Sequence, residues 1–214
     1  MLARRGPPFR FTDGEGPPAT LSTASQPGGT SHGPAIVALT GFMAAGKSTV
    51  GRTLASLLQW QFIDLDSEIE RRSQQTIHDI FAQRGEARFR ELEVDALRSV
   101  LENVAGPTVI ALGGGTFVQE QNAQRLRQCE ARVVFLELDL TLLLRRCLDA
   151  VDRSAHNPRP LAEEEEAFYA LYAQRLPFYR KADLVVNTEH KPAEQIAREI
   201  VERLRLAGPA AFDH

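Results

Sequence analysis

Cysteine and long apolar runs are scarce in this 214-residue chain, and each shortage excludes a class of protein. The two cysteines, Cys129 and Cys147, are too few for a disulfide scaffold or a thiolate metal cluster, so we expect a reducing compartment and buried thiols. No apolar stretch approaches the ~20 residues that cross a bilayer. A net charge of −3 provides no basic surface for nucleic acid. We expect a cytoplasmic protein with neither a membrane nor a nucleic-acid partner, and a monomer.

The beginning of the chain differs in composition from the rest. It is rich in glycine and proline and poor in apolar residues, so it cannot bury enough surface to offset the entropy of ordering. We predict a disordered extension at 1–33, one domain at 34–208 and a short tail at 209–214. Early arginines suggest a transit peptide, which nearby acidic residues and the lack of an amphipathic helix disfavour. The extension is also compatible with an interaction segment, or with a start upstream of the true domain.

Short apolar runs alternate with helical patterns through the rest of the chain. The predicted strands are 35–39, 61–64, 108–112, 131–137 and 184–187, and the predicted helices are 49–58, 67–72, 88–101, 119–128 and 192–204. Buried strands separated by helices indicate a parallel sheet that is covered on both faces. The sequence therefore predicts a doubly wound, five-stranded α/β domain that binds its ligands at the carboxyl ends of the strands.

A glycine-rich loop follows the first predicted strand directly. Residues 41–49 read Gly-Phe-Met-Ala-Ala-Gly-Lys-Ser-Thr and match the phosphate-loop pattern G-x-x-x-x-G-K-[ST]. A strand, a glycine turn and a helix N-terminus together form an anion site, because backbone N–H groups and the helix dipole favour phosphate. Lys47 can reach the β- and γ-phosphates, and the Ser48 hydroxyl can join a magnesium shell. The pattern predicts that the chain binds a nucleoside triphosphate.

Two acidic residues, Asp64 and Asp66, stand at the end of the second predicted strand. Residues two apart point the same way along an extended segment, so both carboxylates can face the phosphate loop. One can hold the magnesium water shell, and the other can accept a proton from an attacking hydroxyl. The alternative is that they cap the following helix. Next to a phosphate loop, the functional interpretation is favoured.

Three glycines and two arginines extend the predicted site. Gly113, Gly114 and Gly115 follow the third strand, where bare backbone lets a ligand approach closely, although a flexible turn is the alternative. Arg90 and Arg175 can each pair with a carboxylate through two N–H groups. Each taken alone reads as a surface arginine.

A polar, proline-containing segment near 149–162 separates two helical stretches. A segment of this kind is typical of a mobile lid. An arginine on such a lid, Arg159, can close onto the transferred phosphoryl group.

The ordered set of motifs over residues 35–206 resembles the shikimate kinase family, which belongs to the phosphate-loop kinases of the nucleoside-monophosphate-kinase-like group. The motifs are Leu39-Thr40-Gly41-Phe42-Met43, Asp64-x-Asp66, Phe89-Arg90-x-x-Glu93, Gly113-Gly114-Gly115, Arg159-Pro160-Leu161 and Arg175-x-Pro177-x-Tyr179. The resemblance implies that ATP, with one Mg²⁺ ion, phosphorylates the 3-hydroxyl of shikimate in the pathway to chorismate and the aromatic amino acids.

The same resemblance implies a role for each site residue. The implied catalytic residues are Lys47, Asp66 and Arg159. The implied ATP contacts are Gly41, Ala44, Ala45, Gly46, Lys47, Ser48, Thr49, Arg146 and Arg159, with Arg146 stacked on the base. The implied shikimate contacts are Asp66, Arg90, Gly113, Gly114, Gly115 and Arg175. The implied magnesium residues are Ser48 and Asp64.

Two departures from the family pattern bear on these expectations. The family often has glycine where Ala44 stands, a modest change if this residue keeps an ordinary backbone conformation. The segment between Arg146 and Arg159 is longer than usual, which affects the lid and the adenine contact. The rival functions are gluconate or nucleotide kinase on the same fold, and a catalytically silent nucleotide-binding module. The two arginines and the triple glycine favour a small anionic polyol acid over a second nucleotide.

Overall fold

A computed structural model describes residues 36–152 and 161–206 of the protein. In chain order the elements are β1 (Ile36–Thr40), α1 (Lys47–Leu58), β2 (Gln61–Asp64), α2 (Leu65–Ser73), α3 (Ile77–Asn103), β3 (Thr108–Ala111), α4 (Glu120–Gln128), β4 (Arg132–Glu137), α5 (Leu140–Asp152), α6 (Leu161–Tyr179), β5 (Leu184–Asn187) and α7 (Ala193–Leu204).

The five strands form one parallel sheet in the order β2-β3-β1-β4-β5, which confirms the predicted α/β class. Strand register fixes the relative heights of the three strands that lead into the predicted site. Ala111 of β3 pairs with Leu39 of β1 on one side and with Asp64 of β2 on the other. The phosphate loop, the triple-glycine turn and the acidic pair therefore leave the sheet at the same edge and at nearly the same level.

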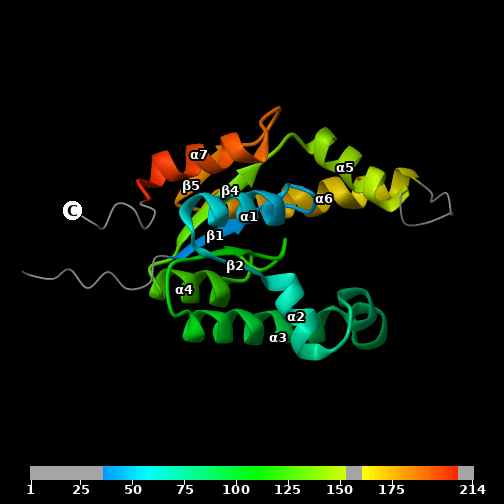
Figure 1. Ribbon diagram of the computed structural model, residues 1–214. Helices are drawn as coiled ribbons and strands as arrows, with labels where there is room; N and C mark the ends of the chain where they lie inside the picture. Colours follow the sequence, from blue (N-terminus) through cyan, green and yellow to red (C-terminus); the bar gives the residue numbers. More distant parts are fainter. Residues whose placement is uncertain (1–35, 153–160, 207–214) are drawn as a thin grey trace, which may run out of the picture. The chain divides into compact units, whose positions relative to one another are not determined.

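Helices cover both faces of the sheet (Figure 1). On one face, apolar residues of α1, α6 and α7 pack against β4, β5 and the alternate residues Val37 and Leu39 of β1. On the other face, α2, α3 and α4 pack against the residues in between, such as Ile36 and Ala38. Successive residues of β1 thus point to opposite cores, as expected of a strand buried on both sides.

Helix α3 is longer than the predicted helix at 88–101, and it is broken. Thr76 begins it as an N-cap, because its Oγ1 accepts a hydrogen bond from Asp79 N at 3.1 Å. Inside the helix, Gly85 has φ 74° and ψ 174°, a conformation that interrupts the helical path. The residues before Gly85 lie outside the predicted helix because this glycine disrupts a continuous periodic pattern.

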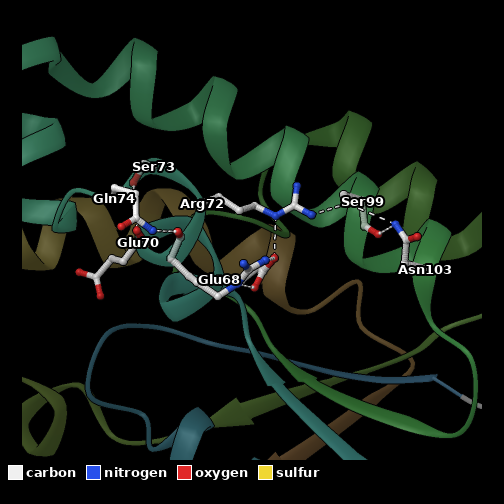
Figure 2. A network of polar contacts seen from close by, with 8 residues as sticks. Glu68, Glu70, Arg72, Ser73, Gln74, Ser99 and Asn103 are labelled. Atoms are coloured by element: carbon white, nitrogen blue, oxygen red, sulfur yellow. Dashed lines mark hydrogen bonds and ion pairs between the residues drawn. The ribbon is translucent and has the colours of Figure 1, made fainter.

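Polar contacts join α2 to α3 beside the apolar packing (Figure 2). Arg72 of α2 donates from Nη2 to Ser99 Oγ on α3, and from Nε to Glu68 Oε1 at 2.6 Å. Asn103 also donates to Ser99 Oγ, at 3.3 Å. Burial of Leu65 and positions like it supplies most of the stabilisation, because exposed ion pairs contribute little. The Arg72–Ser99 contact crosses between the helices, while the other two contacts lie within α2 and within α3. This contact and the apolar packing together hold the helices that carry Asp66 and Arg90.

The region of the predicted lid is only partly described. Helix α5 continues to Asp152 and α6 begins at Leu161, so the ends of the range 149–162 are helical. Residues 153–160, which include Arg159, lie outside the described part of the chain, as do 1–35 and 207–214. In the described residues no helix is both long and apolar enough to span a bilayer. Both cysteines are half-buried, and Cys129 packs against the core that α2, α3 and α4 form, so the expectation of buried thiols is met only in part.

Candidate active site

The phosphate loop takes backbone conformations that ordinary side chains rarely adopt. Gly41 has φ 145°, and a Cβ there would stand 2.9 Å from the carbonyl oxygen of Leu136. Gly46, at φ 88°, is the N-cap of α1, whose first turn carries Ser48 and Thr49. Ala44 is left-handed at φ 58°, so it does not keep the ordinary backbone conformation under which replacing glycine would be a modest change. A left-handed alanine costs about 1–2 kcal/mol, which gives a physical reason for glycine at this position.

Lys47 points back into its own loop. Its Nζ donates to the carbonyl oxygens of Gly41 at 3.0 Å and Phe42 at 2.9 Å. Burial lowers the pKa of Lys47 to about 8, against the opposing effect of Asp66 and Asp64, whose negative charges favour the ammonium. The ammonium is thus held by groups that phosphate oxygens can replace.

Asp64 and Asp66 behave differently although they are two residues apart. Asp64 Oδ1 accepts from the N–H groups of Asp66 at 3.2 Å and Ser67 at 3.4 Å, so it caps α2, which begins at Leu65. Burial raises the pKa of Asp66 to about 6, partly countered by the Lys47 charge. The capping alternative holds for Asp64, while Asp66 has the pKa that suits a proton acceptor near neutral pH.

The glycine turn lies in contact with the side chains of the site. A Cβ on Gly113 would stand 2.8 Å from Asp66 Oδ1 and 2.9 Å from Glu93 Oε1. A Cβ on Gly115 would stand 2.8 Å from Arg90 Cζ. Any side chain at these two positions would displace charged groups. The glycines therefore bring the backbone next to three ionisable side chains.

Arg90 is positioned by two carboxylates on its own helix. Its Nη1 donates to Glu93 Oε2 at 2.9 Å, and its Nη2 donates to Glu86 Oε1 at 2.8 Å. Glu93 is fully buried and also accepts from Thr116 Oγ1 at 2.6 Å and from the Gln119 amide. Glu93 was noticed in the sequence only as part of a motif. Its partners follow β3, far along the chain, so its function was not predictable from spacing.

Arg175 and Tyr179 come from one face of α6. The buried Tyr179 hydroxyl donates to the carbonyl oxygen of Gly114, and its ring stacks on Phe135 with centroids 5.2 Å apart. Burial raises the pKa of Tyr179 to about 12. Arg175 Cζ lies 5.8 Å from the centroid of the Phe42 ring. Helix α6 thus places its arginine between the phosphate loop and the glycine turn.

Arg146 of α5 lies against the phosphate loop, where its Nη1 donates to the carbonyl oxygen of Ala44 at 3.3 Å. Beside it is a cavity of about 160 Å³. The cavity is lined by Ala45, Gly46, Thr49, Val50, Arg146, Thr188, Lys191, Ala193 and Ile196. Sequence reasoning missed Thr188 and Lys191. The available signal was their place between the last strand and the last helix, at the ligand edge of the sheet.

The structure therefore gathers the predicted residues into one site at the carboxyl ends of β1, β2 and β3, with Arg159 outside the described residues. Within the described residues no three His, Cys, Asp or Glu side chains form a metal cluster. Magnesium that is bound largely by nucleotide phosphates and water does not require such a cluster. The fold and the site define a phosphate-loop kinase of the α/β class.

Comparison with known proteins supports this class and identifies the family within it. The family model described as shikimate kinase matches residues 43–205. The shikimate kinase of Dictyoglomus turgidum is 34% identical over 77% of this chain and 94% of its own length. That of Chloroherpeton thalassium is 36% identical over 80% of this chain and 95% of its own. The structure of shikimate kinase from Acinetobacter baumannii in complex with shikimate superposes with a TM-score of 0.71 and 34% identity, over 80% of this chain and 93% of the other. The chain belongs to the shikimate kinase family, whose members are ATP-dependent kinases.

Proposed function

We propose that this enzyme transfers the γ-phosphoryl group of ATP to the 3-hydroxyl of shikimate, giving 3-phosphoshikimate and ADP. The observation that carries the proposal is the meeting of Arg90 and Arg175 on one glycine turn beside a phosphate loop. Two guanidinium groups next to bare backbone suit a small carboxylate that carries hydroxyls. We propose that this reaction serves aromatic amino-acid biosynthesis. We also propose that the enzyme is a monomer and that it acts in the cytoplasm.

On the acceptor side, Arg90 and Arg175 hold the shikimate carboxylate, and the Gly113–Gly115 backbone lies along the ring. Asp66 accepts the proton of the 3-hydroxyl as its oxygen forms a bond to the γ-phosphorus. The bond from that phosphorus to the bridging oxygen of ADP breaks in the same displacement. Support comes from the Asp66 carboxylate, which lies against Gly113 and has a raised pKa.

On the nucleotide side, the N–H groups of the phosphate loop and the first turn of α1 hold the phosphates, and the Lys47 ammonium follows the negative charge into the transition state. The cavity beside Arg146 is proposed to hold the adenine, with the guanidinium against one face of the base. Thr188 and Lys191, which line this cavity, join the nucleotide site under this proposal.

One Mg²⁺ ion is proposed to bind with ATP near Ser48 and Asp64. A hydroxyl and a carboxylate are oxygen ligands of the kind that magnesium prefers, and the Asp64 charge acts on Lys47 inside the phosphate site. When bound, the ion neutralises charge on the phosphates. Arg159 is proposed to contact the transferred group from a lid, which remains a prediction because this segment lies outside the described residues.

A coupled ADP-release assay tests the function, with shikimate, gluconate, AMP and CMP offered separately with Mg·ATP. We expect shikimate to be by far the best acceptor. Arg90→Ala and Arg175→Ala should weaken shikimate binding much more than ATP binding, since ATP has no carboxylate. Comparable turnover with gluconate or a nucleoside monophosphate would refute the assignment. ATP binding without ADP release for any acceptor would favour the silent nucleotide-binding module.

A further inference from the structure

Phe42 is a loop residue whose side chain is buried. It follows Gly41 in the phosphate loop, yet its exposed fraction is 1%. Phosphate binding by a glycine-rich loop uses backbone N–H groups and does not require a large apolar side chain. Phosphate binding therefore does not explain why a large aromatic side chain stands at position 42.

The ring packs on the helix that carries the acceptor-side arginine. It meets Phe168 edge-on at a centroid distance of 5.0 Å and Tyr172 at 5.3 Å, and Arg175 Cζ lies 5.8 Å from its centroid. These three residues of α6 are spaced by four and three positions and so share one face of the helix. Aromatic edge contacts and a cation over a ring each depend on orientation, so the angle of the Phe42 ring affects where this face of α6 lies.

The backbone of the same residue holds the nucleotide-side cation. The Phe42 carbonyl oxygen accepts from Lys47 Nζ at 2.9 Å and from Ala45 N at 3.3 Å. Phosphates compete for the Lys47 ammonium, because phosphate oxygens carry more negative charge than a carbonyl. Nucleotide binding therefore changes the contacts of the peptide to which the Phe42 ring is attached.

The two sides of the site also meet next to Phe42. A Cβ on Gly114 would stand 3.6 Å from Arg175 Nη1 and 3.7 Å from both Gly41 O and Met43 N. Arg175 and the two neighbours of Phe42 in the loop thus all lie close to Gly114 of the acceptor turn. Arg175 also lies over the Phe42 ring, so it has neighbours on both the loop and the acceptor turn.

We propose that Phe42 is a positioning residue that couples the two substrate sites. Nucleotide phosphates draw Lys47 away from the Phe42 carbonyl, and the ring then fixes the α6 face so that Arg175 is ready for the acceptor carboxylate. This inference rests on the proposed function, since it takes Arg175 as an acceptor contact. Because coupling between two ligands is reciprocal, shikimate must tighten nucleotide binding by the same factor.

The test is a calorimetric titration of shikimate into the full-length protein, with and without saturating Mg·ADP. In the wild type we expect Mg·ADP to lower the shikimate Kd by about fivefold or more, the lower range of typical coupling. In Phe42→Leu, which keeps an apolar side chain, we expect that factor to fall below about twofold. The matched control is Phe62→Leu. Phe62 also carries a cation, with Arg52 Cζ 5.2 Å from its centroid, but on β2 away from Arg175, so it should keep the wild-type factor.

Wild-type coupling in Phe42→Leu would overturn the proposal, as would an equal loss in Phe62→Leu or the absence of coupling in the wild type. A general loss of rigidity would weaken the binding of shikimate with and without Mg·ADP to the same extent. The ratio of the two shikimate Kd values would then stay unchanged, so this ratio distinguishes a positioning role from a loss of stability. If Phe42→Leu does not fold, Phe168→Leu removes a ring contact from the α6 side and should reduce the same factor. Failure of the wild type to bind shikimate at all would instead contradict the proposed function.

Discussion

At the scale of single residues, the site holds two charges that burial disfavours. Lys47 has a pKa lowered to about 8 and Asp66 a pKa raised to about 6, and in both cases burial is the largest cause. Each group moderates the shift of the other by opposite charge. The ligand-free protein therefore contains a cation ready for phosphate and a base whose pKa lies just below physiological pH.

The first prediction concerns Asp66 and pH. A base must be unprotonated, so kcat/KM for shikimate should rise as pH increases through about 6, the pKa of Asp66 in the free enzyme. Asp66→Asn should abolish this rise of kcat/KM with pH and lower kcat by about 10²-fold or more. The measurement is the pH profile of initial rates from pH 5 to 8. A wild-type profile that is flat across pH 6 would show that Asp66 does not act as the base.

The second prediction concerns Glu93, which orients Arg90 from a fully buried position. Glu93→Gln keeps the shape but removes the charge from this pair. We expect the KM for shikimate to rise about tenfold or more, since hydrogen bonds to charged groups contribute about 1.5–3 kcal/mol, with little change in the Kd for ATP. Glu91→Gln, at the exposed partner of Arg88, is the control and should behave as wild type. Equal effects of the two substitutions would rule out the positioning role.

At the scale of elements, breaks and caps place the site residues as much as regular structure does. Asp64 begins α2 and so fixes Asp66 in its first turn. Gly85 divides α3, and Arg90 lies in the turn and a half that follows the break. The acceptor-side arginine therefore depends on where the second part of α3 begins.

The third prediction isolates the conformation of Gly85. A Cβ at Gly85 or at Gly106 would meet no described atom within 4 Å, so neither Gly→Ala change introduces a clash with the described residues. Of these two glycines, only Gly85 has a positive φ, and its ψ of 174° is one that residues with a side chain strongly disfavour at that φ. We expect Gly85→Ala to lower the free energy of unfolding by about 1–3 kcal/mol and Gly106→Ala to leave it nearly unchanged or slightly higher. Urea unfolding of both variants measures this. Equal stability would mean that the helix break carries no strain for alanine.

At the scale of the whole molecule, the parallel sheet sets the distance between the two substrates. The phosphate loop and the glycine turn follow β1 and β3, which are neighbours in the sheet, and the acidic pair follows β2 at the next position. Helix α6 then reaches across this edge with Arg175 and Tyr179. These contacts place the proposed acceptor site directly beside the phosphate loop. Because burial lowers the pKa of Lys47, we expect the protonation of Lys47 to be linked to phosphate binding.

The fourth prediction is proton uptake on nucleotide binding. The folded-state pKa of Lys47 is lowered to about 8, so near pH 8 about half of the side chains are neutral. Phosphates favour the ammonium, so ADP should raise this pKa and draw protons from solution, more at pH 8.5 than at pH 7. Calorimetry in two buffers of different ionisation enthalpy measures the uptake. Lys47→Arg, whose guanidinium stays charged, should show none. Proton release or no uptake by the wild type would contradict the assigned contact.

The sequence alone determined the elements whose signals are local. Alternating apolar runs and helices specify the parallel α/β domain, because strand and helix periodicity is a property of neighbouring residues. The phosphate loop is equally local, since the loop and its helix are continuous in the chain. The triple glycine and Asp66 were also found, because each directly follows or lies just past a predicted strand and the ends of parallel strands share an edge.

Only the tertiary structure decided what depends on packing between distant segments. Three features bring together residues that are far apart in the chain and follow no helical or strand spacing. They are the contacts of Glu93 with residues after β3, the contacts of the Phe42 ring with α6, and the cavity that Lys191 lines together with the phosphate loop. The same is true of the pKa values of Lys47 and Asp66, since they follow from burial by the whole fold. The left-handed Ala44 is set by loop closure rather than by alanine's own preference. The local sequence identifies which residues belong to the site. The packing of the sheet and its helices fixes the distances between these residues and the pKa values of their side chains.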